Sequence, residues 1–299
     1  MKSTIQLSKN RIFPSLKSFV PALLLIVVAC TEEIELDPGT FYPNIVVDAT
    51  ITNENSNHLV KLYKTREFGE IEVPMVTGAE VSVSFDDSII RFIEPDTLPG
   101  YYYSEVPFAG QPGIQYHLRI TNYDVDENGV IDTCEAFATM PNTLVIDSVG
   151  YTYNNDYEFL ALTCYAWDPE VKNYYNFKAW KNDTLVTDTL HEYIPQDDEQ
   201  FNGNYTNGVT CQYFQDEVDD EYIVNGDKLT LEIQNIDKAF YNYITSAQKE
   251  YFGYNPMFGG LPANVYSNTS KNAIGIFRVY TVNKASVVVK DFREKPLDK

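Results

Sequence analysis

The sequence predicts a mainly β protein with two β-sandwich-like domains and one helix, at about residues 236–252, packed in the C-terminal domain. Two observations support this fold class. Short runs of alternating apolar and polar residues are separated by Gly, Pro, Asn and Asp, which is typical of sandwich strands. In one segment, apolar residues instead recur at intervals of three and four, as they do on one face of a helix.

The first 29 residues have the features of a signal peptide. A basic region without acidic residues comes first, formed by Lys2, Lys9, Arg11 and Lys17. The apolar run Phe19–Ala29 follows, and a helix of this length spans about 16 Å, too short for the roughly 30 Å hydrocarbon core of a membrane. Val27–Cys30 resembles a lipobox, which predicts cleavage before Cys30 and attachment of diacylglycerol and palmitate to it. An uncleaved helix with a buried Cys30 is the alternative.

The chain is strongly acidic, with 22 basic and 43 acidic residues. Removal of the leader takes four basic residues and no acidic ones, which leaves a formal charge near −25. Such a surface repels nucleic acid and anionic headgroups, so we expect no nucleic-acid partner and membrane attachment through the acyl chains on Cys30. Residues 30–40 form an acidic tether. Its run Thr31–Asp37 resembles the signal that exports lipoproteins of the Bacteroidota to the outer face of the outer membrane.

The N-terminal domain is expected at residues 41–141. Its strand candidates are 44–52, 58–64, 79–85, 89–93, 100–104 and 115–120. The segments Val76–Val83, Pro99–Tyr102 and Gly110–Tyr116 resemble the small transthyretin-like or carboxypeptidase-regulatory sandwich of many exported proteins. This resemblance implies one small β-sandwich.

The C-terminal domain is expected at residues 142–290 and is followed by a charged tail, 291–299. Its strand candidates are 144–153, 158–167, 174–180, 275–282 and 285–290. Residues 191–221 are polar, acidic and poor in aliphatic side chains, which predicts a long surface excursion between strands. The helix over 236–252 carries Ile236, Phe240 and Ile244 on one face, and this stripe is expected to face the core.

One segment matches a calcium-binding loop. Oxygen ligands would come from Asp124, Asp126, Asn128, the carbonyl of Val130, Asp132 and Glu135. The flanking segments have the pattern of strands, whereas the EF-hand loop is flanked by helices. The alternative is a β-hairpin in which Asn128 and Gly129 form a type I′ turn and Glu135 belongs to the returning strand.

The sequence contains no motif of a hydrolase, a zinc protease, a nucleotide-binding loop or a dithiol oxidoreductase. We therefore predict that the protein is not an enzyme and requires no cofactor, with Ca²⁺ as the one ion to consider. Cys134, Cys164 and Cys211 remain after Cys30, and this odd number leaves at least one thiol unpaired. A disulfide, if formed, is expected between Cys164 and Cys211.

The whole mature chain resembles the DUF4249 lipoproteins of the Bacteroidota. The matching segments are Cys30 with its acidic run, Pro43–Thr52, Gly78-Ala79, Phe108–Tyr116, Ala138–Pro141, Ile146–Ser148, the helix 236–252, Asn255–Asn264 and Ala273–Phe277. Members of this family are commonly encoded beside TonB-dependent outer-membrane receptors. The resemblance implies an accessory role at the cell surface and carries no catalytic residue.

These observations predict a non-catalytic outer-membrane lipoprotein that acts as a binding accessory to a β-barrel complex, a TonB-dependent transporter. The sandwich loops and residues 191–221 would contact this receptor. Two alternatives remain open. The protein could bind or process glycans, with exposed Tyr, Trp167 or Trp180 stacking on sugar rings, or it could be a structural or adhesive module rigidified by calcium.

Overall fold

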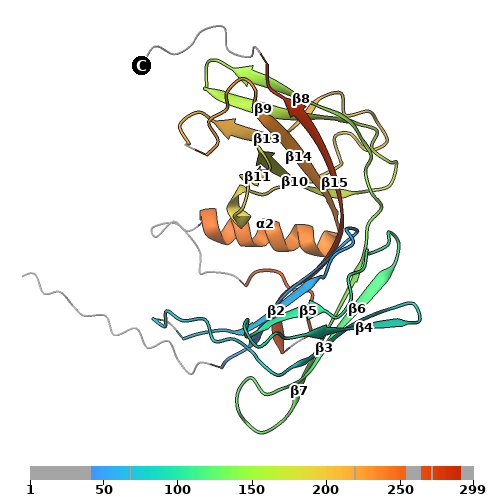
Figure 1. Ribbon diagram of the computed structural model, residues 1–299, viewed down its shortest axis with the longest axis vertical. Helices are drawn as coiled ribbons and strands as arrows, with labels where there is room; N and C mark the ends of the chain where they lie inside the picture. Colours follow the sequence, from blue (N-terminus) through green and yellow to red (C-terminus); the bar gives the residue numbers. More distant parts are fainter. Residues whose placement is uncertain (1–41, 68, 219, 254–263, 271, 291–299) are drawn as a thin grey trace, which may run out of the picture. The chain divides into compact units, whose positions relative to one another are not determined.

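The computed structural model describes residues 42–67, 69–218, 220–253, 264–270 and 272–290. Over this part of the chain the protein is mainly β, with two sheets and one α-helix, which confirms the predicted fold class (Figure 1). A sandwich-like arrangement is consistent with these sheets. Within the described residues, no helix has both the length and the apolar character needed to cross a membrane.

The large sheet has 12 strands. In sheet order they are β11 (Thr184–Leu185), β10 (Tyr174–Lys181), β14 (Lys228–Ile236), β15 (Ala273–Val288), β1 (Ile45–Thr52), β2 (Leu59–Lys64), β5 (Tyr101–Ser104), β4 (Ser88–Ile93), β3 (Glu80–Phe85), β6 (Gln115–Tyr123) and β7 (Asp132–Thr139), with β12 (Ile194–Asp197) also paired to β10. The small sheet has three strands, β13 (Val209–Gln215), β9 (Phe159–Ala166) and β8 (Ile146–Asn154).

Strand β15 joins the two halves of the large sheet. Its first half pairs in parallel with β1, from Ala273 to Tyr280, and its second half pairs antiparallel with β14, from Thr281 to Val288. The sequence predicted two separate strands here, which is wrong. The polar residues in the middle remain extended because they pair with β14, and the Asn283 side chain also donates a hydrogen bond to the carbonyl of Leu144 (2.8 Å).

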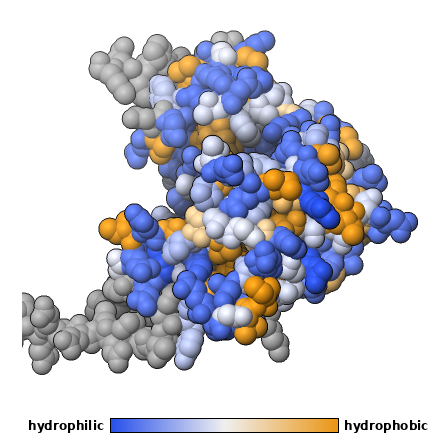
Figure 2. All heavy atoms as spheres, turned by 60° about the horizontal axis from the view of Figure 1, so that its bottom comes forward, coloured by the Kyte–Doolittle hydropathy of each residue, from blue (hydrophilic) through white to orange (hydrophobic). Residues whose placement is uncertain are grey.

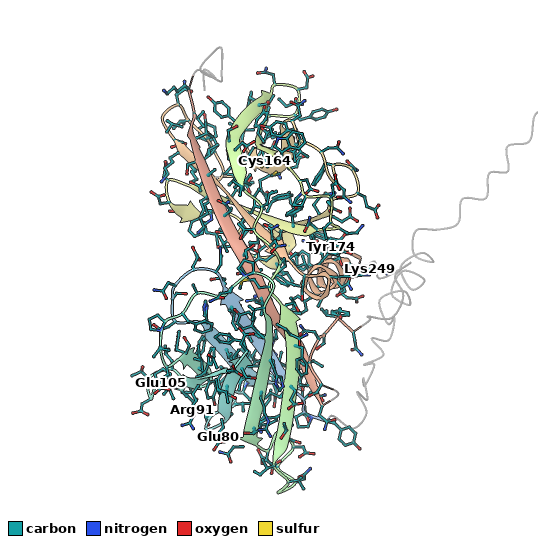
Figure 3. All side chains as sticks on the ribbon, turned by 90° about the vertical axis from the view of Figure 1, so that its right-hand side faces the viewer. Glu80, Arg91, Glu105, Cys164, Tyr174 and Lys249 are labelled. Carbon is teal, nitrogen blue, oxygen red and sulfur yellow. The ribbon has the colours of Figure 1, made fainter. Side chains whose placement is uncertain are left out.

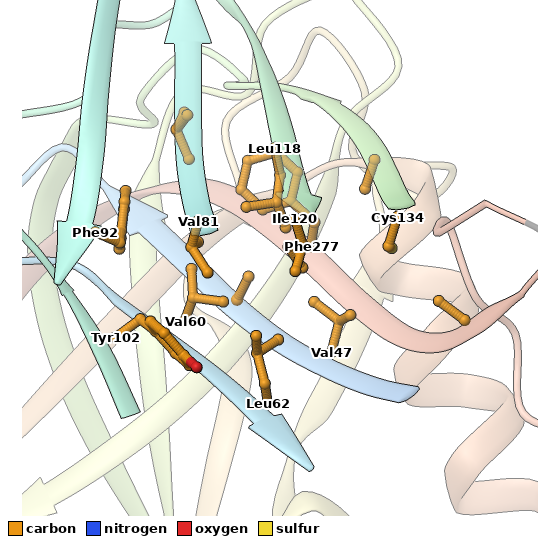
Figure 4. Packing of buried hydrophobic residues seen from close by; sticks show 14 of the residues in the cluster. Val47, Val60, Leu62, Val81, Phe92, Tyr102, Leu118, Ile120, Cys134 and Phe277 are labelled. Carbon is orange, nitrogen blue, oxygen red and sulfur yellow. The ribbon is translucent and has the colours of Figure 1, made fainter. Parts of the chain in front are cut away.

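The first hydrophobic core lies under the N-terminal half of the large sheet. Apolar side chains of β1, β2, β3, β4, β5, β6, β7 and β15 point toward one another, as Figure 4 shows for Val47, Leu62, Val81, Leu118 and Phe277. All of these side chains are buried. Burial of one large aliphatic or aromatic side chain stabilises the fold by roughly 1.5–3 kcal/mol.

The second core is a sandwich between the small sheet and the C-terminal half of the large sheet. Leu160 and Leu162 of β9 pack in one buried cluster with Leu229, Leu231 and Ile233 of β14. These residues alternate along their strands, so each strand presents its other face away from this core.

Helix α2 (Lys238–Gly253) confirms the predicted helix and begins two residues later than expected. Asp237 caps its N-terminus, because the side chain accepts a hydrogen bond from the backbone N–H of Phe240 (2.8 Å). Phe240 and Ile244 pack with Ile276 of β15 in a third cluster. Figure 3 shows Tyr174 of β10 beside this helix.

Residues 191–221 are not the surface excursion that the sequence predicted. Strand β12 in this segment pairs with β10, and β13 pairs with β9. Cys211 and Phe214 of β13 are fully buried in the second core. The division into two domains, 41–141 and 142–290, stays a prediction. Strand β15 lies in the second range and pairs with strands of both ranges.

Candidate binding surface

The outer face of the small sheet carries a row of aromatic side chains. The even-numbered residues of β9, from Leu160 to Ala166, face the second core. Its odd-numbered residues therefore lie on the opposite face, with Phe159 at one end and Tyr165 and Trp167 at the other. A strand rises about 3.3 Å per residue, so Phe159 and Trp167 are separated by roughly 26 Å along this face.

The ring of Tyr165 lies over two glycines, Gly150 of β8 and Gly208, which directly precedes β13. A Cβ atom at Gly208 would stand 2.8 Å from the Tyr165 hydroxyl, and one at Gly150 would stand 3.2 Å from Cε2 of the same ring. Gly208 also has a φ of 85°, which disfavours any other residue. These two glycines therefore let the tyrosine ring lie close to the sheet.

Trp167 and Tyr205 form an exposed aromatic pair at the end of β9. A β-bridge joins the two residues, and their ring centroids are 5.5 Å apart. Trp167 is 65% exposed and Tyr205 is 36% exposed. An indole and a phenol with one apolar face in solvent are typical of protein interfaces and of sugar-binding sites.

The other end of the row is a shallow hollow of about 300 Å³. Phe159 and Tyr213 meet edge to face with ring centroids 5.3 Å apart, and Tyr157 stacks on Phe159 at 6.5 Å. Glu158 and Glu217 line the same hollow. The surface thus combines aromatic faces with carboxylates at this end.

Small side chains separate the two aromatic ends. Ala161 and Thr163 occupy the middle of the outer face of β9 and are each only 7% exposed. The row therefore has two aromatic ends, and small side chains lie between them. We refer to Tyr157, Phe159, Tyr213, Tyr165, Trp167 and Tyr205 as the aromatic face.

A larger hollow of about 550 Å³ lies over β3, β4 and β6. Arg91 and Arg119 both stand opposite Ser82 in the strand register. Glu80 lines the same hollow, and Arg119 also forms an ion pair with Glu135. Figure 3 labels Glu80 and Arg91 on this part of the sheet. The charges balance, so this hollow has no clear preference for an anion or a cation.

The predicted calcium loop lies between β6 and β7, and the structure brings only part of its ligand set together. Carboxylate oxygens of Asp124, Asp126 and Asp132 lie within 4.8 Å of one another. Both oxygens of Asp124 accept backbone N–H groups, from Asn128 (3.1 Å) and Gly129 (2.7 Å). The loop is thus already ordered by its own hydrogen bonds.

Of the three remaining predicted ligands, only Glu135 lies outside the loop. Glu135 belongs to β7, opposite Arg119, and its Oε1 lies 3.6 Å from Nε2 of His117. Asn128 and Val130 stay in the loop, where the Asn128 side chain accepts the N–H of Val130 (2.7 Å). The type I′ turn is also wrong, because positive φ falls on Glu127 and Gly129 but not on Asn128.

The other predicted site residues are placed as follows. Cys164 and Cys211 are buried on the paired strands β9 and β13, their thiols are in hydrogen-bond contact, and both are free. This contact and burial raise the pKa of Cys211 well above its usual range. Trp180 is not an open stacking platform, because Lys284 Nζ lies 4.5 Å above its ring and its Nε1 donates to Glu232 (2.9 Å). Cys30 lies outside the described residues.

The aromatic face is a site that sequence reasoning did not assemble. Trp167 was singled out, yet its partner Tyr205 lies in the segment that was expected to be an unstructured excursion. The alternation of aromatic residues at 157, 159, 165 and 167 was the available signal. Only the pairing of β13 with β9 adds Tyr213 and Tyr205 to it.

Comparison with known proteins gives one result. A family model described as a domain of unknown function, DUF4249, matches residues 31–286. No curated protein is similar enough to this chain to match it. Because the family model covers most of the sequence, the chain belongs to the DUF4249 family.

Proposed function

We propose that this protein is a non-catalytic lipoprotein of the outer membrane of a member of the Bacteroidota, anchored through Cys30 and facing the cell exterior. It acts as a binding accessory to a β-barrel complex, a TonB-dependent transporter. The signal peptide, the lipobox-like residues before Cys30 and the acidic tether support the anchoring.

The aromatic face is the observation that carries the binding role. Trp167 and Tyr157 are 65% and 77% exposed in a chain of strongly negative net charge. Figure 2 shows apolar patches set among hydrophilic residues on one face of the molecule. Trp and Tyr dominate binding energy at protein interfaces because they bury a large area with few rotatable bonds.

The anchoring is tested by growing cells with labelled palmitate. Wild-type protein should carry the label and fractionate with outer membranes, and Cys30→Ala should do neither. Label on Cys30→Ala, or wild-type protein that fractionates away from membranes, would contradict the proposed anchor.

The accessory role is tested by purifying the tagged, lipidated protein gently from its own membrane. A barrel receptor should be recovered in stoichiometric amount, and Trp167→Ala combined with Tyr205→Ala should reduce recovery at least tenfold. Ile71→Ala is the matched control, since Ile71 is 90% exposed and lies outside the aromatic face. Recovery of no barrel protein with the wild type would count against the role.

Glycan binding is the second candidate, and the spacing of the aromatic face favours it. Two aromatic ends with small residues between them match an extended chain of sugar rings that stack at both ends. A glycan array probed with the wild type and with Tyr213→Ala would test this. If no glycan on the array binds and the barrel receptor co-purifies, glycan binding is excluded and the accessory role remains.

A further inference from the structure

Two buried aspartates, Asp168 and Asp198, lie in the loops that carry the exposed pair Trp167 and Tyr205. Asp168 directly follows Trp167 at the end of β9, and Asp198 directly follows β12. Asp168 is 4% exposed and Asp198 is completely buried. Carboxylates are almost never fully buried unless a cation or a set of hydrogen bonds compensates them.

One oxygen of each carboxylate is left without a hydrogen-bond partner. Tyr175 donates its hydroxyl to Oδ1 of Asp168 (2.5 Å), and the backbone N–H of Asn173 donates to Oδ2 of Asp198 (2.6 Å). Oδ2 of Asp168 and Oδ1 of Asp198 are buried and make no hydrogen bond. Both carboxylates raise the pKa of Tyr175, after the larger effect of burial, so both act on this one hydroxyl.

No basic side chain of the described residues forms an ion pair with either carboxylate. The nearest lysine in sequence, Lys172, pairs instead with Asp197 (3.4 Å) and Glu199 (2.9 Å). Burial raises the pKa of Asp168 and is the largest effect; the hydrogen bond from Tyr175 lowers it, the charge of Asp198 raises it, and a hydrogen bond from the Gly203 backbone lowers it. Two buried carboxylates without a basic partner are stabilised by a bound cation or by a proton.

We propose that Asp168 Oδ2 and Asp198 Oδ1 bind a divalent cation of the oxygen-preferring class, calcium. Hard cations of this class take carboxylate oxygens together with backbone carbonyls and water. A buried unsatisfied oxygen in a native fold calls for an ion, a water or a proton, and here two such oxygens belong to neighbouring negative groups. This site is separate from the loop of Asp124, Asp126 and Asp132.

The cation would hold together the segment with Trp167 and Asp168 and the segment from Asp198 to Tyr205, which carry the exposed aromatic pair. The Asp168 backbone N–H already donates to the carbonyl of Asn204 (3.0 Å), and the Gly203 N–H donates to that of Pro169 (3.3 Å). Tyr205 follows Asn204 directly, just as Trp167 precedes Asp168. Calcium would therefore hold Tyr205 beside Trp167, whatever ligand the aromatic face binds.

The experiment uses terbium as a luminescent substitute for calcium on the purified lipidated protein. Tyr175 lies next to the site and sensitises bound terbium. We expect saturable terbium emission that calcium displaces, together with slower hydrogen exchange of residues 198–206 in calcium. The matched control Asp124→Asn with Asp126→Asn should retain emission, and adding Asp168→Asn or Asp198→Asn to that control should weaken the remaining binding at least tenfold.

Three results would overturn the proposal. The first is emission that survives both Asp168→Asn and Asp198→Asn in the chain that already carries Asp124→Asn and Asp126→Asn. The second is emission that only the Asp124 and Asp126 variant removes. The third is hydrogen exchange of residues 198–206 in the wild type that is the same with and without calcium. Circular dichroism of each variant confirms folding, and hydrogen exchange of the wild type with and without calcium gives an answer even if a variant unfolds.

Discussion

Gly275 of β15 packs directly against the backbone of Val47 in β1, where the two strands run in parallel. A Cβ atom at Gly275 would lie 2.1 Å from the Val47 carbonyl oxygen and 2.8 Å from its nitrogen. Gly275 also has a φ of 110°, which side-chain-bearing residues rarely adopt. The pairing of β15 with β1 thus depends on glycine, a residue without a side chain, at position 275.

We expect Gly275→Ala to lower the free energy of unfolding by about 3 kcal/mol or more, because backbone strain and a clash with backbone atoms act together. Urea unfolding followed by circular dichroism measures this loss. The matched control is Gly253→Ala, since a Cβ at Gly253 would meet no atom within 4 Å. Equal stability of both variants would show that β1 and β15 can separate without loss.

Oxidation should join Cys164 and Cys211 in the exported protein. Both thiols are buried on paired strands and in contact, and a disulfide would close a loop of about 47 residues, which stabilises a fold by on the order of 4 kcal/mol in the chain-entropy model. Alkylation of the unfolded, unreduced mature protein should therefore label Cys134 alone.

Reduction of the disulfide should destabilise the wild type. Without a reductant, Cys211→Ser should be destabilised by about the same amount. Cys134→Ser is the control, because Cys134 packs in the first core and not in the second. Alkylation of all three core cysteines without a reductant would contradict the disulfide.

The loop between β6 and β7 should lose stability on Asp124→Ala whether or not calcium binds there. Asp124 accepts two backbone N–H groups in an exposed loop, and loss of such a cap costs about 1 kcal/mol. Thermal unfolding in a chelator measures this structural effect. Millimolar calcium should then raise the melting temperature of the Asp168→Asn variant, and this increase should vanish when Asp124 and Asp126 are also replaced. An unchanged melting temperature in calcium would argue against an ion in this loop.

Acid should destabilise the N-terminal half of the protein through His58. This side chain is 4% exposed, and its Nε2 donates to the carbonyl of Phe108 (2.9 Å). Burial lowers the pKa of His58 below its usual 6.5 and outweighs the hydrogen bond, which raises it. The unfolded chain therefore binds a proton more readily, so the stabilisation is complete above pH 6.5 and declines as the pH falls below it.

The free energy of unfolding of the wild type should fall more steeply below pH 6.5 than that of His58→Gln. Equilibrium unfolding at a series of pH values gives both slopes. His191→Gln serves as the control, because His191 is partly exposed and stacks on Tyr251. Identical slopes for the wild type and His58→Gln would contradict the role of His58.

Strand alternation in the sequence predicts most of the fold. The runs 44–52, 58–64 and 79–85 became β1, β2 and β3 because one face of each is apolar and buried. Strand β14 was overlooked, although Leu229, Leu231 and Ile233 alternate in the same way. Its outward face carries Glu232 and Gln234, which are nearly buried, so the alternation marks a strand covered on both sides.

The sequence by itself determined the mainly β class, the single α-helix in the described residues and the acidic loop after β6, because each depends on residues close together in the chain. Tertiary structure alone decided that one strand, β15, pairs with both β1 and β14, and that Tyr205 lies beside Trp167. It also decided that Asp168 and Asp198 are both buried and near enough for the charge of Asp198 to raise the pKa of Asp168. Strand pairing over long separations brings these groups together, and local periodicity contains no information about which distant strand will be the partner.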